Sequence, residues 1–176
     1  MQKKVPIFMR YKDRSPQRIK KITIMNHHLA QLNIAAMKYP LDDPRMAGFV
    51  AQLDEINALA EASEGFVWRL KDEAGNATDI RPFPDPLTLV NMSVWESATA
   101  LKNYVYGSAH VGVMRQRKEW FHLMKEAYYV LWWIPHGHLP DLTEARQKLE
   151  LLRTNGPSPQ AFDFKNIFEP ANQTNP

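Results

Sequence analysis

One histidine lies among aromatic and basic side chains at a spacing that could support chemistry. His110 is preceded by Tyr104 and followed by Arg115, in a stretch with helical periodicity. An imidazole can transfer a proton near neutral pH or coordinate a haem iron, and an arginine can hold an anionic group of a ligand. We therefore predict that these three residues are catalytic. The alternative is a helix histidine that is simply exposed or hydrogen-bonded.

Two further histidines, His136 and His138, flank Gly137 in a segment that is predicted to be a loop. Such a pair can share a metal ion when a third ligand comes from elsewhere in the chain. No companion ligand stands at a recognisable spacing. We therefore predict an ordinary turn and no metal site.

The sequence lacks the common motifs of several enzyme classes. It has no cysteine, which excludes disulfides and thiolate chemistry. Its seven glycines form neither a dinucleotide-binding nor a P-loop pattern, and no G-x-S-x-G or H-E-x-x-H motif occurs. These absences argue against Rossmann dehydrogenases, P-loop enzymes, α/β-hydrolases and zincin metalloproteases.

The composition is that of one folded domain. The chain has 176 residues, of which 44% are hydrophobic and 23% are charged, and both fractions are close to the averages for folded proteins. Its longest uncharged stretches, residues 22–37 and 127–140, are shorter than the roughly 20 residues of a membrane-spanning helix. We therefore predict a cytoplasmic protein with no membrane contact.

Basic residues are concentrated at the N-terminus. The first 24 residues carry a net charge of +7, and because the whole chain carries +3, residues 25–176 carry −4. We predict a flexible basic head over 1–25, one domain over 26–170 and a frayed tail over 171–176. Met25 is an alternative start, which would leave the head outside the native protein. Scattered cations without an aromatic platform give only salt-sensitive attraction, so we predict no nucleic-acid partner.

Hydrophobic periodicity predicts an α+β fold. Two-residue alternation, or an unbroken apolar run, indicates strands over 28–35, 66–70, 87–95 and 128–134. Three- and four-residue spacing indicates helices over about 44–65 and, with an interruption, over about 97–121. The resulting order is that of the split βαβ, or ferredoxin-like, fold. A further helix over 144–153 and a strap over 161–168 are predicted to follow.

Several segments of the chain resemble a bacterial domain family of unknown function. The segments are VWES at 94–97, SAH at 108–110, RKEWF at 117–121, LWWIP at 131–135, GH at 137–138 and NGPSP at 155–159. That family is similar to the antibiotic-biosynthesis-monooxygenase-like domains of the dimeric α/β-barrel superfamily. The resemblance covers about residues 28–168, and it implies a ferredoxin-like protomer whose sheet packs against that of a second protomer in a homodimer.

The resemblance also implies a range of chemistry. The superfamily includes cofactor-independent oxygenases, haem-degrading oxygenases and haem-dependent monooxygenases of the spheroidene type. The haem-degrading branch uses an asparagine on the first strand, and a tryptophan and a histidine on the second helix. Asn33 and His110 resemble the first and last of these. Tyr104 stands roughly at the tryptophan position, but closer to His110 than in that branch.

Taken with the residues, the resemblance predicts a monooxygenase-like oxidoreductase. Its apolar or aromatic small-molecule substrate would lie between the sheet and the second helix, in contact with four side chains, Asn33, Trp95, Met92 and Trp133. The enzyme would use either no cofactor or haem with His110 as the axial ligand. One alternative is a haem-binding protein or haem-dependent monooxygenase of the spheroidene type. A second is a non-catalytic dimeric ligand-binding module.

Overall fold

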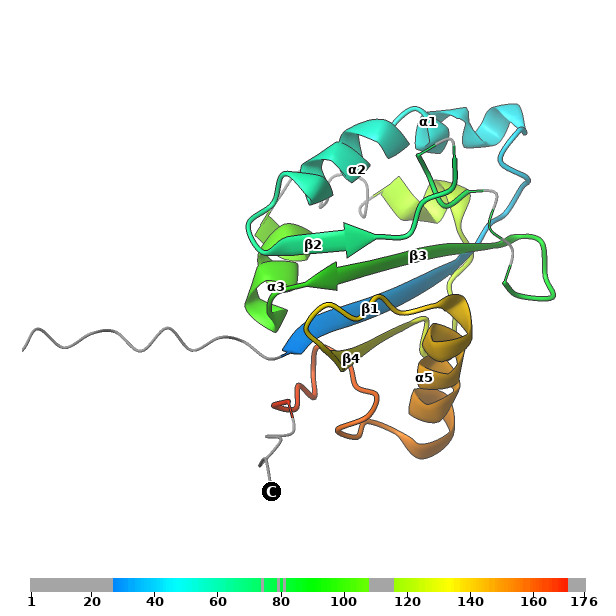
Figure 1. The fold of residues 1–176 in the computed structure, drawn as a ribbon. Helices are drawn as coiled ribbons and strands as arrows, with labels where there is room; N and C mark the ends of the chain where they lie inside the picture. Colours follow the sequence, from blue (N-terminus) through cyan, green and yellow to red (C-terminus); the bar gives the residue numbers. More distant parts are fainter. Residues whose placement is uncertain (1–26, 74, 79, 81, 108–115, 171–176) are drawn as a thin grey trace, which may run out of the picture.

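The computed structural model describes residues 27–73, 75–78, 80, 82–107 and 116–170. Its centre is an antiparallel four-stranded sheet in the order β2-β3-β1-β4 (Figure 1). The strands are β1 (His27–Ala36), β2 (Phe66–Arg69), β3 (Thr88–Trp95) and β4 (Tyr129–Pro135). This strand order, with β1 and β2 separated by β3, is that of the split βαβ unit, which confirms the predicted ferredoxin-like α+β fold.

The first helical region is broken, where the sequence predicted one continuous helix over about 44–65. It consists of a 3-10 turn, η1 (Pro44–Met46), and two α-helices, α1 (Ala47–Val50) and α2 (Leu53–Glu61). The region begins with an N-cap, since Asp43 Oδ1 accepts from the backbone N–H of Arg45 at 2.9 Å. The break lies where the N–H of Gln52 donates to the carbonyl of Phe49, which is a three-residue step that tightens the helix.

The second helical region begins as predicted. Helix α3 spans Ala98–Gly107, and the hydroxyl of Ser97 accepts from the N–H of Ala100 at 3.1 Å, which is the geometry of an N-cap. Residues 116–120 are again helical. Residues 109–115 of the predicted helix over 109–121, which include His110 and Arg115, lie outside the described residues.

The C-terminal appendix contains both predicted elements. Helix α5 spans Leu142–Asn155, with Asp141 Oδ1 accepting from the N–H of Glu144 at 2.7 Å. It ends at Gly156, whose φ of 73° is the left-handed conformation that favours glycine. The strap follows, and the backbones of Leu131 and Phe162 exchange two hydrogen bonds at the free edge of β4.

Helix α5 covers one face of the sheet, here called the α5 face (Figure 1). Its nine inward side chains are 0–4% exposed: Ala30, Leu32, Ile34, Val90, Met92, Val94, Val130, Trp132 and Ile134. Ala145, Leu149 and Leu152 of α5 pack against them, as do Ile80 and Phe83 of the connection between β2 and β3. The dimeric barrel implied by the resemblance would pack this face against a second sheet. Within one chain the face is already buried, so that dimer would require α5 and the connection to move.

Helices α1 and α2 lie over the opposite face, here called the α2 face (Figure 1). At one end of it, Leu29, Trp95 and Leu131 pack with Leu101 of α3 and Phe162 of the strap. At the other end Leu89 packs with Phe49 and Leu53. Trp132 and Trp133 are consecutive residues of β4 and point to opposite faces. None of the described helices is long and apolar enough to cross a membrane.

Candidate functional site

A cavity of about 470 Å³ lies between the α2 face and the first helical region. Residues 33–35 of β1 and 89–91 of β3 form its floor, and α1, α2 and the segment 117–124 form its walls. Most of the lining side chains are apolar, among them Phe49, Leu53, Ile56, Leu89, Phe121, Leu123 and Met124. Its volume lies within the range of small-molecule sites.

Two asparagines stand side by side in the cavity floor. Asn33 of β1 and Asn91 of β3 are directly opposed in the antiparallel register, which places their Cβ atoms about 4.5–5.5 Å apart on the same face. Neither side chain forms a hydrogen bond with the described part of the chain. The neighbouring opposed pair, Gln31 and Ser93, is hydrogen-bonded. Ser93 Oγ donates to Gln31 Oε1 at 2.9 Å and accepts from Trp95 Nε1 at 2.9 Å. Of these two pairs in the sheet, Asn33 and Asn91 therefore offer free polar groups to a ligand, and Gln31 and Ser93 do not.

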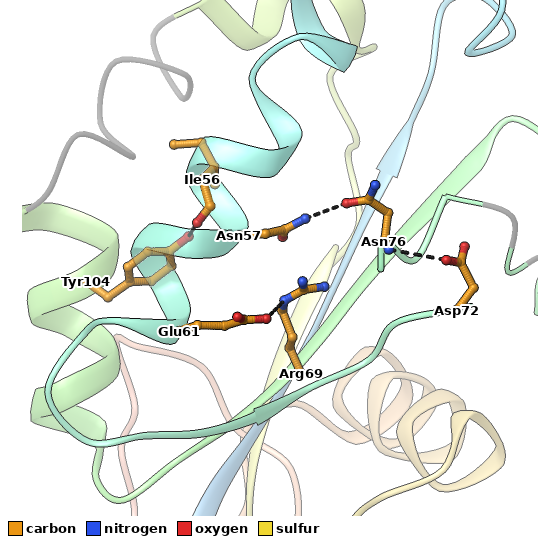
Figure 2. Close-up of polar contacts among 7 residues, drawn as sticks. All are labelled: Ile56, Asn57, Glu61, Arg69, Asp72, Asn76 and Tyr104. Carbon is orange, nitrogen blue, oxygen red and sulfur yellow. Dashed lines mark hydrogen bonds and ion pairs between the residues drawn. The ribbon is translucent and has the colours of Figure 1, made fainter. Parts of the chain in front are cut away.

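A polar network holds one wall of the cavity together, as Figure 2 shows. Asn57 of α2 donates through Nδ2 to Asn76 Oδ1 at 2.7 Å, and Arg69 Nε of β2 donates to Glu61 Oε1 of α2 at 2.8 Å. Asn57, Asn76 and Arg69 all line the cavity. These contacts tie α2 to β2 and to the connection that follows it, so they fix the width of the cavity.

The far end of the cavity is basic. Lys38, Arg117, Lys118 and His122 lie there, and no aspartate or glutamate is among the described lining residues. Lys38 joins the end of β1 to the 116–122 segment, since its Nζ donates to the carbonyl of Lys118 at 2.6 Å and its N–H to the carbonyl of Trp120 at 2.8 Å. The backbone therefore holds this cationic end against the sheet.

Of the residues predicted from the sequence, Asn33 lines this cavity. Tyr104 does not: its ring stacks on Trp95, with ring centroids 5.1 Å apart, and its hydroxyl donates to the carbonyl of Ile56 at 3.4 Å (Figure 2). Burial raises the pKa of Tyr104 to about 12, so its phenol is protonated at neutral pH. Tyr104 is placed to position α3 against α2.

The other predicted contacts lie in packed regions. Trp95 is fully buried beside Phe66 and Tyr104. Met92 belongs to the α5 face, on the opposite side of the sheet from the cavity floor. Trp133 is half-buried under the strap, where its Nε1 donates to the carbonyl of Phe168 at 2.6 Å. None of these three lines the cavity.

Sequence reasoning missed Asn91, Arg69 and Arg117. A signal was present for Asn91, because asparagine is depleted in strand interiors and two of them fell at the centres of predicted neighbouring strands. Arg69 carried a weaker signal of the same kind, as a charge inside a short strand. Nothing local indicated Arg117, whose place at the cavity depends on how the 116–122 segment joins β1.

No metal site is visible within the described ranges, where no three His, Cys, Asp or Glu side chains come together. In the predicted turn, His138 Nε2 instead contacts Glu144 Oε2 at 2.7 Å, and Glu144 Oε1 accepts from Trp132 Nε1 at 2.7 Å. The predicted haem ligand, His110, lies outside the described residues. His122 is the one histidine among the described lining residues, and it is exposed.

The chain is similar to a protein of unknown function from Nitrosomonas europaea, with 14% identity and a TM-score of 0.41 over 66% of this chain and 98% of that chain. It is similar to Rv0793 from Mycobacterium tuberculosis, with 17% identity and a TM-score of 0.40 over 65% of this chain and 98% of that chain. It is also similar to a mutant of SnoaB, a cofactor-independent oxygenase from Streptomyces nogalater, with 12% identity and a TM-score of 0.39 over 66% of this chain and 99% of that chain. A search of curated proteins found no match.

A protein-family model gives a clearer result. The family described as "Domain of unknown function (DUF3291)" matches residues 28–176, which include the whole sheet, the cavity lining, α5 and the strap. The chain therefore belongs to this family of domains of unknown function.

Proposed function

We propose that this domain binds a small, largely apolar organic molecule in the cavity and oxidises it as a monooxygenase-like enzyme. The observation that carries the proposal is the pair Asn33 and Asn91, unpaired within the described chain, beside the apolar side chains of a cavity of about 470 Å³. Polar groups that converge in an apolar hollow are what orients a small ligand.

The asparagine pair occupies strand positions where this residue type is unusual. Strand positions favour β-branched and aromatic side chains, and asparagine is disfavoured there. Sites that break a local rule of this kind are frequently functional sites. Each carboxamide offers two N–H donors and one oxygen acceptor, so the pair can bind a carbonyl or hydroxyl oxygen of a ligand that lies flat on the sheet.

The chemistry follows from where charge develops. In a cofactor-free oxygenation the substrate itself reduces O₂: an acidic methylene loses a proton, the carbanion passes its electrons to O₂, and the products are a carbonyl and water. Before it reacts with O₂, the deprotonated substrate carries negative charge on an oxygen, and N–H donors fixed in place stabilise that charge. We assign this role to Asn33 and Asn91. The proton acceptor is His110 in this proposal, with Arg115 orienting the substrate.

A non-catalytic ligand-binding module is the second candidate. It is favoured by the absence of a buried base among the described lining residues, where His122 is the one imidazole and is exposed. Such a module would bind the same ligands and consume no oxygen. The homodimer also remains part of the proposal, formed either through a surface other than the α5 face or with α5 displaced.

Oxygen uptake by the full chain in the presence of anthrone, a tricyclic carbon acid, tests the proposal. We expect uptake of one O₂ for each carbonyl formed. In the double variant Asn33→Leu/Asn91→Leu we expect the rate of uptake to fall at least about 100-fold, because the loss of a single oxyanion donor has an effect of that size. Gln147→Leu on the outer surface of α5 is the matched control and should retain the wild-type rate. An unchanged rate in the double variant would overturn the assignment, and ligand binding without uptake would establish the module.

A further inference from the structure

The charges that line the cavity are of one sign. Among its described lining residues are Lys38, Arg69, Arg117 and Lys118, together with His122 and no acidic side chain. Arg69 is neutralised by Glu61, with 2.8 Å between Nε and Oε1. The positive charge of the other three residues, Lys38, Arg117 and Lys118, is concentrated at one end of the cavity.

Arg117 differs from every other described arginine. Arg45 pairs with Asp43 at 2.6 Å and Arg69 with Glu61 at 2.8 Å. Arg153 donates to the carbonyl of Ala127 at 2.9 Å. The fourth, Arg146, lies over the ring of Phe83 at 5.4 Å. Arg117 is half-buried, yet within the described chain its guanidinium has no hydrogen bond, ion pair or aromatic contact.

The half-buried guanidinium of Arg117 lacks an anionic partner within the described chain. Removing a cation from water is unfavourable unless it is paired. The guanidinium fork matches the two oxygens of a carboxylate, with which it forms two charge-assisted hydrogen bonds. A carboxylate bound beside Arg117 would supply the partner that the described chain lacks.

We infer that the ligand of this cavity is an organic anion, namely an aromatic or alicyclic body that carries a carboxylate. The inference rests on the proposed function and narrows its substrate class. The body would lie on the apolar lining beside Leu89 and Ile56, with Asn33 and Asn91 beneath it. The carboxylate would reach Arg117. Lys38 and Lys118 would add a positive field that draws the anion to this end.

Isothermal titration of the full-length protein with 1-naphthoate and 1-naphthamide tests the inference, because these ligands share a shape and differ in charge. We expect the wild-type chain to bind 1-naphthoate about tenfold or more tightly than 1-naphthamide, which corresponds to one charge-assisted contact. Equal affinities, or no binding of either compound at millimolar concentration, would overturn the inference without any variant being needed.

Variants locate the contact. Arg117→Gln should remove the preference for 1-naphthoate while changing the affinity for 1-naphthamide less than about twofold, and Arg117→Lys should retain part of the preference, because a lysine keeps the charge and loses the fork. Arg146→Gln is the matched control, since Arg146 lines a separate surface hollow between α5 and Phe83 of the connection from β2 to β3. A preference lost in Arg146→Gln and retained in Arg117→Gln would contradict the inference.

This experiment is independent of catalysis. If oxygen uptake fails but the Arg117-dependent preference holds, the anion site stands and the oxygenase proposal falls. If oxygen uptake occurs while both naphthalene ligands bind equally, the enzyme stands and the substrate is not an anion.

Discussion

The two faces of the sheet use the same strands for different purposes. On the α5 face, alternate residues of β1, β3 and β4 are apolar and 0–4% exposed under α5. On the α2 face, the intervening residues change from apolar at Leu29 and Trp95, through the hydrogen-bonded Gln31 and Ser93, to free asparagines at the cavity.

The difference separates stability from binding. Burial of apolar area dominates folding free energy, and the α5 face is closed and uniformly apolar. The α2 face leaves part of its area open beside polar groups, which stabilises the fold less and leaves room for a ligand. Substitutions on the α5 face should therefore lower the free energy of unfolding and leave ligand binding unchanged. Substitutions at the cavity on the α2 face should weaken ligand binding and change the free energy of unfolding little.

The largest loss of stability should come from the α5 face. Leu149→Ala removes a side chain that is 1% exposed and packs on the sheet, so we expect the free energy of unfolding to fall by about 2–5 kcal/mol. Urea denaturation measures it. Binding of 1-naphthoate by the folded fraction should not change. Gln147→Ala on the exposed side of α5 serves as the control, and an equal loss there would contradict the assignment of α5 as the cover.

Loss of the α5 cap should have a smaller effect. Asp141→Ala deletes the acceptor of the Glu144 N–H, at 2.7 Å, and N-cap removal of this kind lowers stability by about 1 kcal/mol. Thermal unfolding of Asp141→Asn, which keeps an acceptor, should resemble the wild type. A result in which both variants unfold together would indicate that the carboxylate charge, and not the cap hydrogen bond, stabilises the helix.

The stability of the fold should depend on pH through His28, which lies on β1 at the end of the α5 face. His28 is 8% exposed, and its burial lowers its pKa from 6.5. The nearby His136, with 4.5 Å between the two ring centroids, lowers the pKa of His28 further, and Glu96 raises it. His28 therefore binds a proton more readily in the unfolded chain than in the folded chain. The neutral His28 leaves the folded state at full stability above about pH 6.5, and the free energy of unfolding falls as the pH drops from there through the lower pKa of the folded state.

Urea midpoints measured between pH 7.5 and 5 should therefore fall less steeply in His28→Gln than in the wild-type chain. His122→Gln, an exposed histidine far along the chain, is the control and should follow the wild type. A slope that is unchanged in His28→Gln would show that other groups cause the acid destabilisation.

The smallest effect on stability should come from the cavity floor. Asn91→Val places a better strand former at an exposed position, so the free energy of unfolding should change by less than about 0.5 kcal/mol. Binding of 1-naphthoate should weaken in the same variant. If Asn91→Val unfolds readily and binds normally, the asparagine pair has a structural role and the comparison between the two faces fails.

The strands could be predicted from the sequence because alternation is a local property. The pattern at Leu32, Ile34, Val90 and Met92 requires only that one face be buried, and the caps at Asp43 and Asp141 are equally local. The break between α1 and α2 could not be found in this way. This region packs against residues that are distant in sequence, among them Trp120, whose ring lies against Gly48 of α1.

The site was harder to predict than the fold. Periodicity places Trp95 and Asn33 on one face, but it does not tell whether that face is filled by neighbours or open to a ligand. The structure fills it at Trp95 with Tyr104 and leaves it open at Asn33. Arg117 reaches the same cavity from a segment that is distant in sequence, through the contacts of Lys38 with the 116–122 backbone.

The most direct test of the account is an NMR titration of the full-length protein with 1-naphthoate, following the side-chain N–H signals. If the cavity over the two asparagines is the binding site, the carboxamide signals of Asn33 and Asn91 and the Nε–H signal of Arg117 should shift together and saturate at one ligand per chain. Shifts confined to Arg146 and Gln147 on α5, with the two asparagines unmoved, would contradict it.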